Sequence, residues 1–242
     1  MPSATARFRK IFRWDDIVIA ALCALAIYLF VERPIHPTVT KAPSETDSAE
    51  PIAAFQPGTG PNLARGVDDF SGKAWQLEGA LITAGSEVAP DGTKTAALLR
   101  ETHAGNRHRI VTTLDGLAPG EAYTLSIFVK PGQRRALMLE MADTPPAKYG
   151  VVRYDLAREQ IAYVGGDIGN AGIQSLPDGW FRLWAAMPYQ SAKMAFSVSL
   201  LRTPDTIIYP GTKGDGALIW GVQFEPGEIP RDYSSGQQPP RK

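Results

Sequence analysis

The chain has 242 residues, with 25 basic and 25 acidic side chains and a formal net charge of zero. This balance excludes a strongly basic surface, so we expect no nucleic-acid partner. The 23 glycines and 20 prolines favour many turns and short strands over long helices. Cys23 is the single cysteine, which excludes an intrachain disulfide and a cysteine-based zinc site.

The N-terminal segment has the pattern of a membrane anchor. An uncharged apolar run extends from Ile17 to Val31, and Trp14 lies where an interfacial aromatic residue is expected. The run is preceded by four basic residues: Arg7, Arg9, Lys10 and Arg13. Because basic residues stay on the cytoplasmic side of a membrane, we expect the rest of the chain to lie outside.

The alternative is a cleaved signal peptide. At 1.5 Å per residue the run spans about 22 Å, against a bilayer core of about 30 Å. The apolar region of a signal peptide has roughly 7–15 residues, but residues 31–34 make a poor cleavage site. We therefore expect a cytoplasmic N-terminus over residues 1–13 and a single transmembrane helix over residues 14–33.

A proline-rich linker is expected to follow the anchor. Residues 34–61 contain six prolines among serine, threonine, alanine and acidic residues, with almost no apolar periodicity, which is typical of an extended tether. The polar residues 234–242 read as a flexible tail. Between them, residues 62–233 form the expected folded domain.

Within residues 62–233, apolar and polar residues alternate in short runs that end at turn signals. Leu125, Ile127 and Val129, for example, alternate with polar residues and stop before Pro131-Gly132. Such alternation predicts strands of an antiparallel sandwich or barrel. The expected strands cover residues 95–101, 108–114, 123–130, 136–141, 151–155, 160–164, 181–187, 196–200 and 218–224.

Several segments also match a known family in order and spacing. They are Asp69-Phe70-Ser71, Ala74-Trp75, Ile82-Thr83-Ala84, Ala89-Pro90-Asp91-Gly92-Thr93, His108-Arg109-Ile110, Tyr123-Thr124-Leu125-Ser126, Lys130-Pro131-Gly132, Tyr154-Asp155-Leu156, Asp178-Gly179-Trp180-Phe181-Arg182, Gly214-Asp215-Gly216 and Ile219-Trp220-Gly221-Val222-Gln223-Phe224-Glu225. Over residues 61–233 the chain resembles the carbohydrate-binding-module-like jelly-roll domains of phage tail and bacterial surface proteins. The resemblance implies an all-β fold, an antiparallel jelly-roll-like β-sandwich.

No catalytic motif is visible, and no cofactor is expected. The nucleophile elbow, the zinc-protease helix and the phosphate loop are all absent from the sequence. His103 and His108 have no further ligands at a metal-site spacing, and the glycine-rich residues 165–172 read as a flexible loop. A structural calcium ion would have to draw its oxygen ligands from Asp167, Asn170, Asp178 and Asp215, whose spacing supports no known calcium loop.

Sugar binding requires an exposed aromatic ring and planar polar groups. Arg182 and Trp184 share the face of their predicted strand that lies opposite Phe181 and Leu183, so we expect them to contact a ligand. The alternative for Trp184 is packing in a second layer. The other candidate ligand residues are Tyr154, Tyr163 and Tyr189. Trp75, Trp180 and Trp220 lie beside turns or strand ends and fit either core packing or ligand contact.

Two functions remain open. The first is a non-catalytic binding module, anchored in the lipid bilayer of a bacterial inner membrane, that presents a periplasmic sandwich to a glycan. The second is a single-helix accessory subunit whose sandwich packs on membrane-protein partner subunits of a larger complex, respiratory or photosynthetic. The short span, with Asp15 and Asp16 at its entrance, motivates the second because neighbouring helices satisfy such a helix better than lipid alone.

Overall fold

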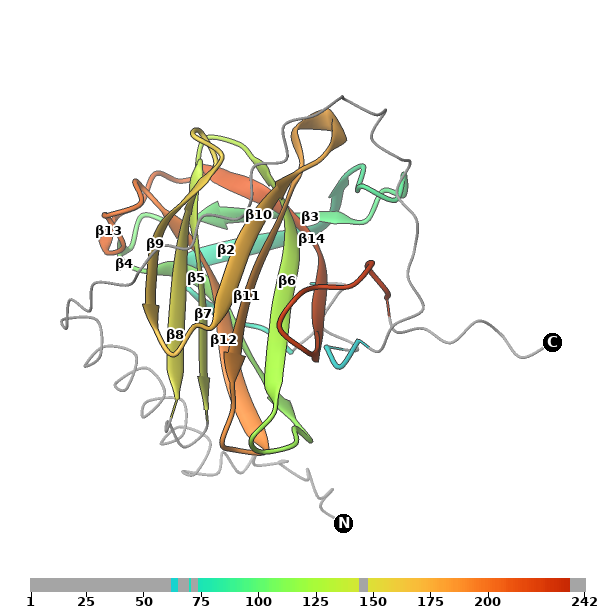
Figure 1. The fold of residues 1–242 in the computed structure, drawn as a ribbon. Helices are drawn as coiled ribbons and strands as arrows, with labels where there is room; N and C mark the ends of the chain where they lie inside the picture. The colour runs from blue at the N-terminus through green and yellow to red at the C-terminus, as the bar shows by residue number, and fades with distance from the viewer. Residues whose placement is uncertain (1–61, 65–69, 71–73, 144–147, 236–242) are drawn as a thin grey trace, which may run out of the picture. The chain divides into compact units, whose positions relative to one another are not determined.

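The computed structural model describes residues 62–64, 70, 74–143 and 148–235. Its main elements are two six-stranded antiparallel sheets (Figure 1). The first sheet has the order β1 (Gln76–Glu78), β5 (His108–Asp115), β12 (Lys193–Leu201), β7 (Ala136–Asp143), β8 (Tyr149–Asp155) and β9 (Gln160–Gly166). The second has the order β10 (Asn170–Ser175), β11 (Phe181–Pro188), β6 (Ala122–Pro131), β14 (Gly216–Pro226), β3 (Ala96–Glu101) and β2 (Ala80–Glu87). A small ladder joins β4 (Gly105–Asn106) to β13 (Tyr209–Pro210), and a 3₁₀ turn, η1, covers Pro177–Gly179.

The core lies between the two sheets. On β7 the side chains of Leu137, Leu139 and Met141 are buried in it, and on β6 those of Leu125 and Ile127. Alternate residues of a strand point to opposite faces of its sheet, so these apolar runs can cover one face continuously. The predicted antiparallel β-sandwich is confirmed.

All nine predicted strands are present, but the edge strands β1, β2 and β10 were missed. The prediction of a flexible loop over residues 165–172 is wrong, because Gly165 and Gly166 close β9 and Asn170 opens β10. Every residue of β10 is paired with β11. Gly172 fits this strand because a Cβ there would overlap the ring of Trp184, its cross-strand neighbour.

A second aromatic cluster covers the outer face of the second sheet. Phe128, Trp180, Trp220 and Tyr233 are all buried in it, and the rings of Trp220 and Tyr233 lie 4.6 Å apart. Trp75 instead lies in the main core, stacked on Phe70. All three tryptophans that fitted either core packing or ligand contact are therefore buried.

The predicted basic N-terminus, transmembrane helix and linker, residues 1–61, lie outside the described residues, as do residues 236–242 of the predicted tail. In the described ranges, no helix is long and apolar enough to cross a membrane. The anchor therefore stays a prediction.

Asp143, the last residue of β7, is expected to make stability depend on pH. Its Oδ2 accepts a hydrogen bond from the Gln190 N–H at 3.0 Å, its Oδ1 is buried and has no partner among the residues that the structure describes, and burial raises the pKa of the carboxyl group. A raised pKa means that the folded state binds the proton more tightly than the unfolded state does. The contribution of this carboxyl group to stability therefore falls as the pH rises from its pKa in the unfolded state to its pKa in the folded state. Urea unfolding should therefore show Asp143→Asn gaining stability relative to the wild type between acidic and neutral pH. A difference that does not change with pH would contradict this account.

Candidate functional site

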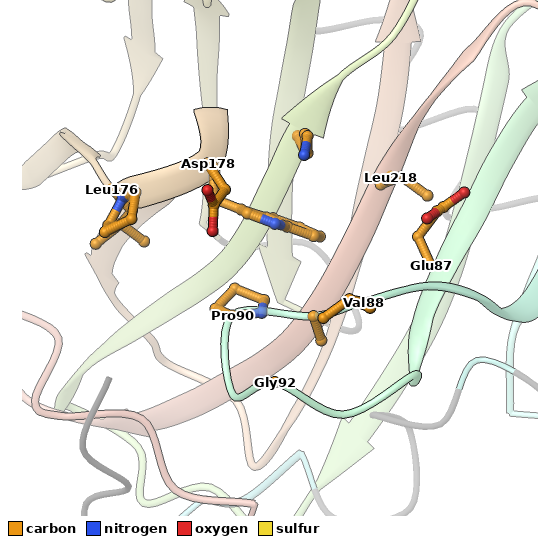
Figure 2. A pocket seen from close by; sticks show the side chains of 11 residues that line it. Glu87, Val88, Pro90, Gly92, Leu176, Asp178 and Leu218 are labelled. Atoms are coloured by element: carbon orange, nitrogen blue, oxygen red, sulfur yellow. The ribbon is translucent and has the colours of Figure 1, made fainter. Parts of the chain in front are cut away.

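A pocket of about 630 Å³ lies on the outer side of the second sheet (Figure 2). One wall runs from Glu87, the last residue of β2, to Gly92, and the other is the turn from Leu176 to Trp180. Between the walls, Lys130 of β6 and Leu218 of β14 come from positions that pair with each other across the two strands. The pocket thus joins four segments that are distant in sequence.

Local turn chemistry shapes both walls. In the first wall the Gly92 N–H donates to the Ala89 carbonyl at 2.9 Å. In the second, the Trp180 N–H donates to the Pro177 carbonyl at 3.2 Å, with Asp178 and Gly179 in the left-handed region at φ of 58° and 76°. Aspartate and glycine tolerate this conformation better than most residues, so the Asp178-Gly179 pair fits this wall.

Three charged side chains line the pocket: Glu87, Lys130 and Asp178. Figure 2 shows the carboxylates of Glu87 and Asp178 on opposite sides of it. Within the described ranges, neither carboxylate has a hydrogen-bond or ion-pair partner, and Lys130 has no ion-pair partner. Val88, Pro90 and the indole of Trp180 add apolar surface. A pocket of this size, largely apolar with a few polar groups, is typical of small-ligand sites.

Two of the five predicted ligand residues lie in the core instead. Tyr154 and Tyr189 are both fully buried. The Tyr154 hydroxyl donates to the Trp184 carbonyl at 2.5 Å, and burial raises the pKa of both phenols. Since neither ring has a face open to solvent, their expected role as ligand contacts is corrected to core packing.

Arg182 and Trp184 share the outer face of β11, as expected, but Arg182 is buried there. Its guanidinium lies 5.2 Å from the Phe128 ring centroid and donates to the Ser126 hydroxyl at 3.0 Å. Burial lowers its pKa. The second aromatic cluster thus occupies the face expected to be open, and of these two residues only Trp184 is partly exposed.

Tyr163 lies on β9, in the other sheet, and is partly exposed. The guanidinium of Arg153 stands 4.1 Å from its ring centroid and is held by the Pro204 carbonyl at 3.0 Å. The structure therefore does not bring the five predicted residues together, and none of them lines the pocket.

A polar network lies on the outer face of the first sheet. Glu140 accepts hydrogen bonds from Arg107 at 2.8 and 2.9 Å, from Tyr149 at 3.1 Å and from Ser197 at 2.9 Å. Arg109 adds a longer contact at 3.4 Å. Burial and the charge of Glu140 raise the pKa of the Tyr149 hydroxyl. Because Glu140 is buried and its partners are within the chain, we regard this network as structural.

Three of the four oxygen-bearing residues considered for calcium are engaged in other contacts, and the fourth, Asp178, lines the pocket. Asp167 pairs with Lys148 at 2.8 Å, Asp215 pairs with Arg134 at 3.2 Å, and the Asn170 amide donates to the Glu228 carbonyl. In the described part of the chain, no three histidine, cysteine, aspartate or glutamate side chains are placed to hold a metal ion.

The chain matches no protein-family model and no curated protein. Solved structures of low identity resemble it. The enzymatically active domain of bacteriophage CBA120 tailspike protein 4 aligns at 13% identity and a TM-score of 0.43, over 68% of this chain and 21% of that one. TmCBM61, solved with β-1,4-galactotriose, aligns at 11% identity and a TM-score of 0.40, over 69% and 95%. The mannan-recognising module TmCBM27 aligns at 13% and 0.34, over 68% and 94%. The chain thus spans about a fifth of the tailspike domain but nearly all of either module.

Proposed function

We propose that this chain is a non-catalytic glycan-binding module and that the pocket holds the sugar. The observation that carries the proposal is a cavity of about 630 Å³ where apolar surface, two unpaired carboxylates and a lysine meet. A sugar ring has apolar faces and hydroxyl groups that both donate and accept. Carboxylates accept from hydroxyls in strong charge-assisted bonds, and the lysine ammonium donates to them.

The same geometry supports binding without catalysis. A general acid or base in an enzyme is usually oriented by a hydrogen-bonded third group. Within the part of the chain that the structure describes, Glu87 and Asp178 have no such partner. Carboxylates that no third group orients suit contacts to hydroxyls better than a fixed proton transfer.

The sequence supplies the proposed setting. The basic residues before an apolar run favour a protein anchored in a bacterial inner membrane, with the sandwich on its periplasmic side. A linker of about 30 residues has a contour limit near 100 Å, so the module could reach glycans that lie well away from the bilayer. The alternative of an accessory subunit predicts membrane partners that co-purify at fixed ratios.

Glycan binding can be measured by calorimetry on the full-length chain in a detergent without a sugar headgroup. We expect at least one of the hexaoses of glucan, xylan, mannan, galactan, glucosamine or N-acetylglucosamine to bind. Asp178→Asn and Glu87→Gln should each weaken that binding about tenfold or more, because a hydrogen bond to a charged group contributes about 1.5–3 kcal/mol.

The matched control is Asp115→Asn. It makes the same charge change on β5 of the other sheet, where the carboxylate is exposed and faces Lys193 at 3.6 Å. Asp115→Asn should leave the affinity unchanged. The proposal fails if none of these oligosaccharides binds, or if the pocket variants bind as well as the control variant.

A further inference from the structure

The charged residues that line the pocket indicate which class of glycan it would bind, an inference that rests on the proposed function. Glu87 and Asp178 contribute two negative charges and Lys130 one positive charge. No ion pair within the described ranges neutralises any of them. A ligand that enters strips water from these groups, and the lost hydration is recovered only if the ligand supplies complementary charge or hydrogen bonds. The pocket therefore has an excess of one negative charge to satisfy.

The arrangement of the carboxylates indicates where a positive group would lie. Glu87 lies at the end of β2 and Asp178 in the facing turn, so their side chains approach the same space from opposite sides (Figure 2). A single cation between them is attracted by both, and because both carboxylates are exposed, salt screens this attraction. Trp180 also lines this space, but its indole is buried in the second aromatic cluster, so the attraction for a cation comes from the two carboxylates.

Lys130 limits how much positive charge the ligand can carry. Its ammonium lines the same pocket, so a polyamine or an oligolysine would be repelled at that end. A sugar hydroxyl, in contrast, can accept a hydrogen bond from Lys130. The lining thus suits one amine among several hydroxyls.

We propose that the pocket selects glycans that carry an unacetylated amino sugar, with the protonated amine between Glu87 and Asp178 and a neighbouring hydroxyl on Lys130. N-acetylation removes the positive charge and adds bulk, so an N-acetylated sugar should bind more weakly. A uronic acid should be disfavoured, because its carboxylate would face the same two side chains.

The test compares N-acetylglucosamine hexaose from which a single acetyl group has been removed with the fully acetylated hexaose of the same linkage, by calorimetry on the full-length chain at a mildly acidic pH that keeps the one free amine protonated. We expect the amino form to bind about tenfold or more tightly. This preference should shrink in high salt, which screens exposed charges, and should be lost in Glu87→Gln and Asp178→Asn but kept in Asp115→Asn.

The outcomes separate this inference from the proposed function. Equal or tighter binding of the N-acetylated or neutral hexaoses would overturn the amino-sugar inference and leave glycan binding in place. Equal binding of hexalysine would also overturn it, since attraction would then depend on charge alone. If no saccharide binds, the proposed function itself fails, and the amino-sugar inference fails with it.

Discussion

Glu140→Gln is expected to lower the free energy of unfolding by about 3–5 kcal/mol, which is the usual cost of removing one charged partner from a buried ion pair. Glu140 is 1% exposed, and its carboxylate is the shared partner of Arg107 and Arg109. Glutamine keeps the shape of the side chain but loses the charge. Two arginines, both nearly buried, would then face a neutral amide, and one of their hydrogen bonds would meet an N–H donor.

Glu78→Gln provides a matched control in the same network. Glu78 also pairs with Arg109, at 2.7 Å, but its side chain is 38% exposed, so water compensates for the lost charge. We expect this variant to cost about 0–1 kcal/mol, as is usual for surface ion pairs. Urea unfolding at neutral pH, followed by tryptophan fluorescence, would compare them. Similar losses in the two variants would show that Glu140 is not the centre of the network.

Alternation predicted the strands but not always which face each residue occupies. On β8 the residues Val151, Val152 and Tyr154 are all buried, although the first lies on the outer face of the sheet and the other two in the core. When both faces of a strand carry apolar residues, the alternation of apolar and polar residues no longer shows which face lies toward the core. For this reason the sequence could not show that Tyr154 is a core residue.

The second aromatic cluster explains the error at Arg182. A β-sandwich normally exposes the outer face of each sheet to water, and on that ground Arg182 was expected to be accessible to a ligand. Here Tyr233, near the C-terminus, packs against Phe128 and Trp220 and closes over that face. Phe128 and Tyr233 are more than 100 positions apart, so their contact leaves no local signal in the sequence.

The pocket was missed for a related reason. Asp91-Gly92 and Asp178-Gly179 are pairs typical of turns, and each lies in the turn of one wall. Their approach depends on the strand order β11-β6-β14-β3-β2, which places the end of β2 and the start of β11 around the same part of the sheet. β2 and β10 were themselves unpredicted, because edge strands with many exposed residues show weak apolar alternation.

Asn62→Asp is expected to lower the free energy of unfolding by about 3 kcal/mol or more. The Asn62 side chain is fully buried where the N-terminal end of the described domain meets its C-terminal end. Its Nδ2 donates to the carbonyls of Val222 at 3.0 Å and Ser234 at 2.9 Å, while its Oδ1 accepts from the N–H groups of Ala64 and Phe224. Aspartate would lose both donated bonds and direct a carboxylate oxygen at two carbonyl oxygens.

Asn170→Asp is the matched control, because it makes the same Asn-to-Asp change near the surface. The Asn170 amide makes a single bond, to the Glu228 carbonyl at 3.0 Å, near the surface, so its loss should cost no more than about 1 kcal/mol. In Asn62→Asp, the segment around Ser234 should detach and uncover Tyr233 and Trp220, which would appear as a red shift in tryptophan emission below the unfolding transition. A loss equal to that of Asn170→Asp, without a spectral shift, would show that Asn62 does not fasten the two ends together. In that case other contacts would hold the two ends together, and the backbone hydrogen bonds of the buried Asn62 side chain would contribute little to stability.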